Sequence, residues 1–114
     1  MAIQNEEKIW KLVDAKKEDF IELSDRVFDT PETLYNEFSS VSEHIATLEK
    51  EGFTITKNVC GMPTAVIGEA GNEGPVIAIL GEFDALPGLS QEPGVATHSP
   101  VIEGGNGHGC GHNL

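Results

Sequence analysis

The stretch IATLEKEGFTITKNV (residues 45–59) decides the fold, because the spacing of its apolar residues changes at Gly52. Before this glycine, Ile45 and Leu48 continue a stripe of apolar positions with helical spacing. After it, apolar and polar residues alternate through FTITK, as in a strand with one face in water. Glycine commonly follows the last residue of a helix. The change of period predicts an α/β chain in which the helices precede the sheet.

Two helices are predicted before Gly52, over residues 5–28 and 31–51. The motif DTPET separates them, since Thr30 is a good N-cap and Pro31 suits the first position of a helix. Apolar residues in the second helix follow one another at steps of 4, 3, 4 and 3, and they are Leu34, Phe38, Val41, Ile45 and Leu48. This spacing is typical of an amphipathic helix that packs on a core.

Residues 53–81 are predicted to form about three strands, within FTITKNV, TAVIGEA and VIAIL. The last of these, residues 76–80, is short and wholly apolar, which is typical of a strand buried on both faces. Such a strand needs a layer of structure on each side, and only two helices are predicted. We therefore expect the chain to be the opening part of a larger α/β domain.

The charge of the chain excludes several classes of function. There are 19 acidic and 7 basic residues, a formal net charge of -12, which argues against binding to nucleic acid or to an anionic membrane. Neither a secretory signal nor an apolar run of ~20 residues is visible, so a cytoplasmic location is expected. In that reducing setting Cys60 is expected to be a small buried apolar residue, and Cys110 a free thiol or a metal ligand.

Residues 82–114 carry the chemistry and are predicted to be metal-site loops. Glu82 and Asp84 follow VIAIL directly, at the strand end where open α/β sheets bind ligands. His108, Cys110 and His112 are spaced two apart, so an extended backbone would bring them to one side. Imidazole and thiolate are ligands that suit zinc. The alternative is a pair of solvated carboxylates and a mobile, glycine-rich tail.

Two longer motifs resemble a known family. GEFDALPGLSQ (residues 81–91) and GGNGHGCGHNL (residues 104–114) are similar to the metallo-amidohydrolases related to aminoacylase and carboxypeptidase G. Within that family they resemble the branch of the aminobenzoyl-glutamate and indole-acetyl-amino-acid hydrolases. TPETLYNEFSS and GMPTA extend the resemblance over nearly the whole chain. It implies a zinc-peptidase-like catalytic domain with two divalent metal ions, zinc or manganese, and a separate dimerisation domain.

The resemblance also implies roles for single residues. Cys110 and His112 match two metal ligands of the cysteine-bearing branch, and Asp84 matches the aspartate of the first metal motif, H-x-D. Asp84 is therefore expected to hold or bridge the metal ions, as a catalytic residue. Glu82 stands in the place of the histidine of that motif, and His108 lies within the second motif. The resemblance leaves ligation by these two residues open.

The family's remaining parts are expected beyond Leu114. They are the paired glutamates that supply the general base and a bridging ligand, a further histidine ligand and the dimerisation domain. Residues 1–114 are thus expected to be an N-terminal fragment, inactive alone, of an enzyme that cleaves an amide bond to release an amino acid. The implied substrate is p-aminobenzoyl-glutamate, another N-acyl amino acid or a dipeptide, and the full-length form is expected to be an oligomer, with a related subunit as one option. The second interpretation is a stand-alone, non-catalytic module that binds metal or regulates a relative.

Overall fold

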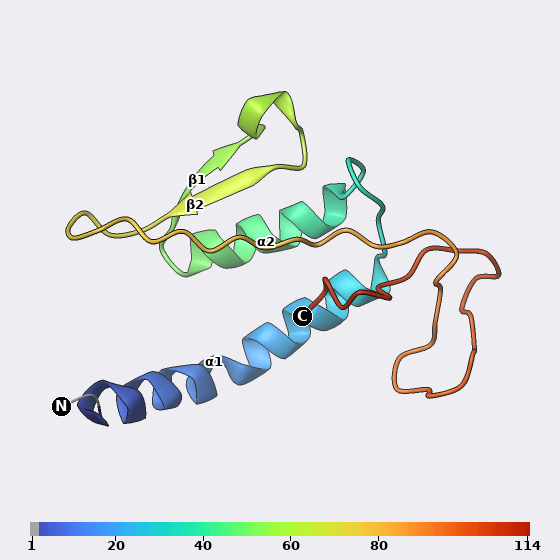
Figure 1. Ribbon diagram of the computed structural model, residues 1–114, viewed down its shortest axis with the longest axis horizontal. Coiled ribbons are helices and arrows are strands. Elements are labelled where there is room, and N and C mark those ends of the chain that lie inside the picture. Colours follow the sequence, from blue (N-terminus) through green and yellow to red (C-terminus); the bar gives the residue numbers. More distant parts are fainter. Residues whose placement is uncertain (1–2) are drawn as a thin grey trace.

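The computed structural model describes residues 3–114 as two helices followed by a small sheet and a long loop region (Figure 1). The helices are α1 (Ile3–Asp29) and α2 (Phe38–Lys50), and the strands are β1 (Thr54–Lys57) and β2 (Val66–Glu69). A short 3-10 turn, η1 (Val59–Gly61), lies between the strands. The predicted α/β class, with helices before the sheet, is confirmed.

The second half of α1 packs against α2, and this contact buries part of the core. Leu23, Val27 and Val41 are buried there, and Val27 is completely buried. Ion pairs between exposed side chains join the two helices, among them Arg26 with Glu43 at 2.7 Å. Such surface pairs contribute little to stability, so burial of the apolar face is what holds the helices together. Among the residues that the structure describes, neither helix is both long and apolar enough to cross a membrane.

The start of α2 differs from the prediction, because α2 begins at Phe38 rather than at residue 31. Thr30 is not its N-cap: the Thr30 hydroxyl donates to the Arg26 carbonyl and so closes the end of α1. The cap comes from Glu32, whose Oε1 accepts from the Ser39 amide at 2.9 Å and whose Oε2 accepts from the Ser40 amide at 2.8 Å. A carboxylate at this end of a helix also suits the helix dipole.

Burial and hydrogen bonding act in opposite directions on the Glu32 carboxyl. Burial alone would raise the pKa of Glu32, but the hydrogen bonds donated by Ser40 and Ser39 outweigh it. The pKa of Glu32 therefore lies below its ordinary value, and the capping carboxylate stays charged.

The two strands confirm the prediction made from the alternating pattern. They pair antiparallel, with Thr54 opposite Glu69 and Lys57 opposite Val66. The sheet lies against α2 (Figure 1), and at Gly68 an added Cβ would come within 3.2 Å of the Leu48 side chain. This close approach places one face of the two-stranded sheet on the helix.

The expected buried strand at residues 76–80 is wrong in this structure. The segment is extended loop, and its side chains are among the most exposed in the molecule, with Val76 at 98% and Leu80 at 93%. A strand needs a neighbouring strand for its backbone and a covering layer for an apolar face. In the described part of the chain neither lies against these residues, so the apolar composition alone does not produce a strand.

The turn between β1 and β2 corrects a second expectation. Cys60 is exposed rather than buried, and its backbone is left-handed, with φ of 54°. Asn58 has a similar φ of 55°. Two left-handed residues within three positions reverse the chain tightly, and Cys60 lies exposed in this turn.

Candidate metal centre

The segment that carries Glu82 and Asp84 is fixed between two other parts of the chain. The Ala85 amide donates to the Glu32 carbonyl at 2.7 Å, in the connection between the helices. Leu86 and Gly107 exchange two backbone hydrogen bonds, of 3.0 and 2.9 Å, and so tie the segment to the C-terminal tail. Ala85, at the centre of these contacts, is 1% exposed. The tail and the acidic segment therefore lie side by side although more than twenty residues separate them.

Gly107 is what lets these two loops approach so closely. A Cβ added at this position would overlap the carbonyl oxygen of Leu89. The Ser90 amide, which follows Leu89, donates to the Gly105 carbonyl at 3.0 Å, so hydrogen bonds join the backbones of the two loops here. A side chain at residue 107 would have to separate the two loops.

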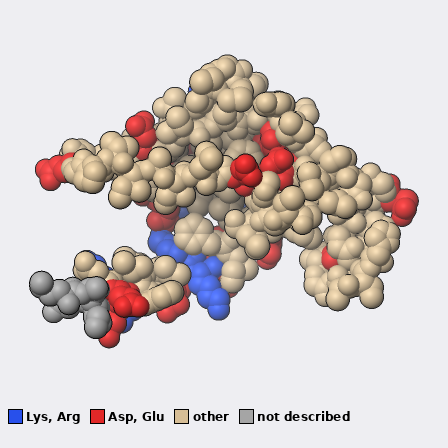
Figure 2. All heavy atoms as spheres, in the orientation of Figure 1, with Lys and Arg blue, Asp and Glu red and all other residues tan. Residues whose placement is uncertain are grey.

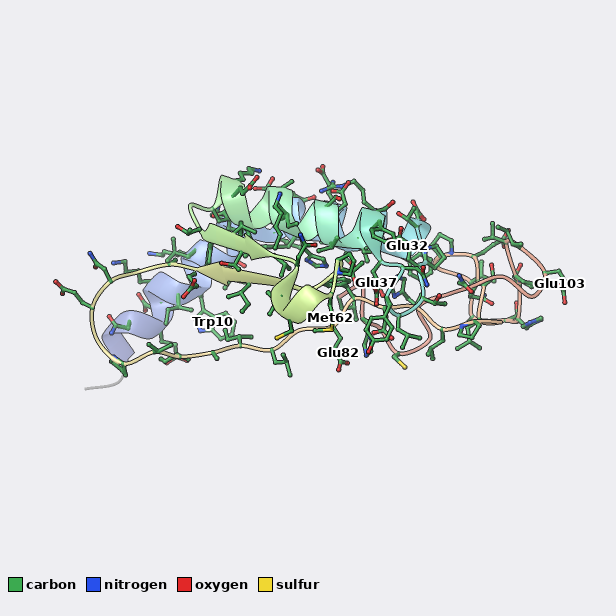
Figure 3. The ribbon with its side chains drawn as sticks, turned by 90° about the horizontal axis from the view of Figure 1, so that it is seen from above. Trp10, Glu32, Glu37, Met62, Glu82 and Glu103 are labelled. Atoms are coloured by element: carbon green, nitrogen blue, oxygen red, sulfur yellow. The ribbon has the colours of Figure 1, made fainter. Side chains whose placement is uncertain are left out.

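Glu82, Asp84 and His112 form the candidate site. The His112 ring lies between the two carboxylates, with Nδ1 at 2.8 Å from Asp84 Oδ1 and Nε2 at 3.1 Å from Glu82 Oε2. Phe83, between the acids, turns the other way and stacks on His44 of α2, with the ring centroids 5.0 Å apart. Alternation along an extended backbone thus puts both acids on one side, as the sequence predicts. Figure 3 shows Glu82 on the side of the molecule away from α2.

The electrostatics of the cluster favour positive charge. The hydrogen bond with Asp84 raises the pKa of His112 above its ordinary value and outweighs the lowering effect of burial, and the charges of Asp84 and Glu82 add smaller upward effects. The chain as a whole carries a net charge of -12, and acidic side chains are spread over the face seen in Figure 2. A cation is the natural counter-charge for two carboxylates in such a surface.

The donor atoms fit a divalent metal ion. One ligand atom each from Glu82, Asp84 and His112 lies within 4.8 Å of the others. The 3.1 Å between Glu82 Oε2 and His112 Nε2 is short enough for both atoms to bind one ion at the usual ~2.0–2.2 Å. Asp84 then accepts a hydrogen bond from the other ring nitrogen, which is how carboxylates commonly orient metal-binding histidines.

Cys110 and His108, the other candidate ligands, do not join this group in the described structure. Cys110 is exposed on the tail. His108 is half-buried against α1: its Nε2 lies 3.1 Å from the Val27 carbonyl oxygen, and its ring is near Phe28. Burial lowers the pKa of His108. Ligation by Cys110 stays a prediction from the resemblance, with no support from this arrangement.

A separate hollow of about 450 Å³ lies beside the tail. It is bounded by the connection between the helices and by residues of the long loop, including Gln91, Ile102 and Asn106. None of the three residues of the cluster lines it. The hollow and the candidate metal centre are therefore distinct features of the loop region.

Comparison with known proteins shows that the chain is similar to an amide-bond hydrolase and to carboxypeptidases. It is 50% identical over 103 residues to one of the subunits of p-aminobenzoyl-glutamate hydrolase from Escherichia coli, a match that covers 90% of this chain and 21% of that protein. It is also 34% and 31% identical, over 111 residues each, to thermostable carboxypeptidases 2 and 1 from Saccharolobus solfataricus, again over 90% of this chain and over 27% of each relative. No family model matches.

These matches confirm the resemblance that the motifs indicate. The chain spans only about a fifth to a quarter of the length of the curated relatives. The identity extends over nine tenths of the chain, so the helices and the sheet share the likeness with the glycine-rich motifs. Because the chain covers so little of their length, the activity of the whole relatives is only proposed for this chain.

Proposed function

We propose that this chain supplies part of the metal centre of an amidohydrolase. The observation that carries the proposal is the cluster in which Glu82 and Asp84 both contact His112. Glu82 and His112 would hold a divalent ion, zinc or manganese, and Asp84 would orient the imidazole. A bound ion at such a site polarises the amide carbonyl and lowers the pKa of a water molecule.

Each residue of the cluster has a defined task in this proposal. Asp84 would accept a hydrogen bond from Nδ1–H of His112, which keeps the lone pair of Nε2 turned toward Glu82. Glu82 supplies a second donor atom and a negative charge on the exposed side of the ring. These two donors leave positions open for further ligands, which suits a catalytic rather than a closed structural site. The expected second ion would need residues outside this cluster.

For the whole protein we propose cleavage of an amide bond that releases an amino acid. The 50% identity to the p-aminobenzoyl-glutamate hydrolase chain favours an aminobenzoyl-glutamate-like substrate, and the carboxypeptidase relatives keep other N-acyl amino acids and peptides as alternatives. Because that hydrolase chain is named as a subunit, an assembly with a related chain is also proposed, at the expected cytoplasmic location. The 114-residue chain alone is proposed to bind metal but not to turn over substrate.

Calorimetric titration of the chain with zinc and with manganese tests the metal centre. His112→Ala removes a donor atom, and Glu82→Gln replaces a charged carboxylate with a neutral, weaker amide donor, so both are expected to weaken binding by ~10-fold or more. Asp84→Ala is expected to act similarly through the lost orientation of His112. The matched control is Glu103→Gln, an exposed acid far from the cluster (Figure 3). Equal binding by His112→Ala and the unaltered chain contradicts the proposal. A large effect of Cys110→Ser would show instead that the thiol of the tail is a ligand.

A further inference from the structure

Three side chains of the C-terminal tail reach back to α1 and to the residues just after it. The Asn106 amide donates to the Pro31 carbonyl at 3.2 Å. His108 Nε2 lies 3.1 Å from the Val27 carbonyl oxygen, and the Asn113 amide donates to the Ser24 hydroxyl oxygen at 3.0 Å. The partners are 75 to 89 residues away in the sequence. The tail is therefore held by a distant helix as well as by its own turns.

The contact at Val27 fixes the role of His108. A carbonyl oxygen only accepts, so the proton of the imidazole must be on Nε2. The same carbonyl also accepts from the Thr30 amide at 3.2 Å, and Val27 is completely buried, so this acceptor belongs to a residue of the core. The other ring nitrogen, Nδ1, is buried without a hydrogen-bond partner among the described residues. Nδ1 either has no ligand or is a further donor atom for a metal ion. The two roles predict different results when His108 is substituted.

We propose that His108 and Asn113 are positioning residues that dock the tail on the last turns of α1 and thereby hold His112 against Asp84. Neither is a metal ligand in this proposal, which rests on the metal centre proposed above. The argument is the spacing: one anchor lies four residues before His112 and the other directly after it. His112 is thus fixed at both ends to the same helix. The surrounding glycines alone would leave it many conformations.

Substitutions at residue 108 separate the positioning role from ligation. In His108→Gln the side-chain amide can place an N–H donor near the present position of Nε2, but it has no imidazole for a metal. In His108→Asn the amide is too short to reach the Val27 carbonyl. At the second anchor, Asn113→Asp keeps a hydrogen-bond partner for the Ser24 hydroxyl, whereas Asn113→Leu removes it.

The first test is the zinc affinity of the four variants, measured by calorimetry. Circular dichroism of each variant checks that its helix content is unchanged. His108→Gln and Asn113→Asp are expected to bind close to the unaltered chain, and His108→Asn and Asn113→Leu ~10-fold or more weaker, as for other outer contacts of metal ligands. Loss of binding in His108→Gln equal to that of His112→Ala would make His108 a ligand and overturn the proposal. Unchanged binding in His108→Asn and Asn113→Leu would overturn it as well.

A second measurement does not depend on metal. Nuclear Overhauser contacts between the His112 ring and the β protons of Asp84 are expected in the unaltered chain and in His108→Gln, and absent in His108→Asn. If the unaltered chain binds no zinc, the metal centre fails, and these contacts alone decide the positioning role. Contacts that persist in His108→Asn with normal helix content would refute it.

Discussion

The Nδ1 atom of His112 lies 2.8 Å from Oδ1 of Asp84, a contact between residues 28 apart in the sequence. Because this contact uses Nδ1, the outer nitrogen Nε2 faces Glu82 and the solvent side of the loop. When His112 is protonated, its ring forms ion pairs with Asp84 and Glu82. When it is neutral, its Nε2 and the Glu82 carboxylate are free to bind a metal ion. The charge state of His112 decides between the two.

We predict that the pKa of His112 lies above its ordinary value and falls when Asp84 is removed. The hydrogen bond with Asp84 is the largest cause of the shift, whereas the charge of Glu82 is a smaller one. Asp84→Ala should therefore lower the pKa of His112 more than Glu82→Gln does. Titration of the His112 ring protons by NMR in the metal-free chain measures this. An unchanged pKa in Asp84→Ala would contradict the contact itself.

The sign of the pH dependence follows from the raised pKa. The His112–Asp84 contact stabilises the fold fully below the ordinary histidine pKa of about 6.5, and this contribution is lost as the pH rises through the higher pKa of the folded state. Metal binding has the opposite trend, since a ligating imidazole must lose its proton. Zinc affinity should therefore increase as the pH rises through that same value, which calorimetry at several pH values would measure.

Glu32 predicts a separate pH effect at the start of α2. Its pKa is lowered in the folded state, so its contribution is complete above about 4.5 and is lost as the pH falls through the lower folded value. Glu32→Ala should lower the free energy of unfolding by about 1 kcal/mol at neutral pH, the usual effect of losing an N-cap. The difference from the unaltered chain should shrink in acid. Urea unfolding at several pH values, with Glu103→Ala as the control, measures this difference. A difference that stays constant with pH would disprove the prediction.

The parts of the fold that local patterns predict are those that local interactions form. α1, β1 and β2 follow from apolar periodicity, and the shared side of Glu82 and Asp84 follows from alternation along the chain. The start of α2 was not predictable in this way, because its cap is a carboxylate seven residues before Ser39 rather than the residue next to the helix. Tertiary contacts decided that boundary.

The contacts of the candidate site show the same limit. The motifs GEFDALPG and GHGCGHNL point to the right loops, but not to which of their donor atoms meet. His108 and Cys110 look equivalent in sequence, yet one reaches a carbonyl of α1 81 residues away and the other is exposed. Only their tertiary contacts distinguish them. Spacing of two predicts a shared side, and the glycines between these residues remove that constraint.

Gly107→Ala should weaken the metal centre without altering any donor atom. The added Cβ overlaps the Leu89 carbonyl, so the loops that carry Asp84 and His112 must move apart. We expect zinc affinity to fall ~10-fold or more, as when other supports of metal ligands are lost, and the Leu86 amide to exchange faster with solvent. Gly81→Ala is the matched control, because an added Cβ there meets no atom within 4 Å. Equal behaviour of the two variants would exclude a special role for Gly107.

The exposed segment at residues 76–80 gives the sharpest contrast between sequence and structure. If the segment is a buried strand, as its composition predicts, a polar substitution such as Ile79→Thr should be as harmful as one in the core. Ile79 is 95% exposed in the structure, so Ile79→Thr should change the free energy of unfolding by less than about 0.5 kcal/mol. Val27→Ala, at a completely buried position, should lower it by roughly 2 kcal/mol. Urea unfolding of both variants measures the difference, and destabilisation by Ile79→Thr to the level of Val27→Ala would show that the segment is covered in solution.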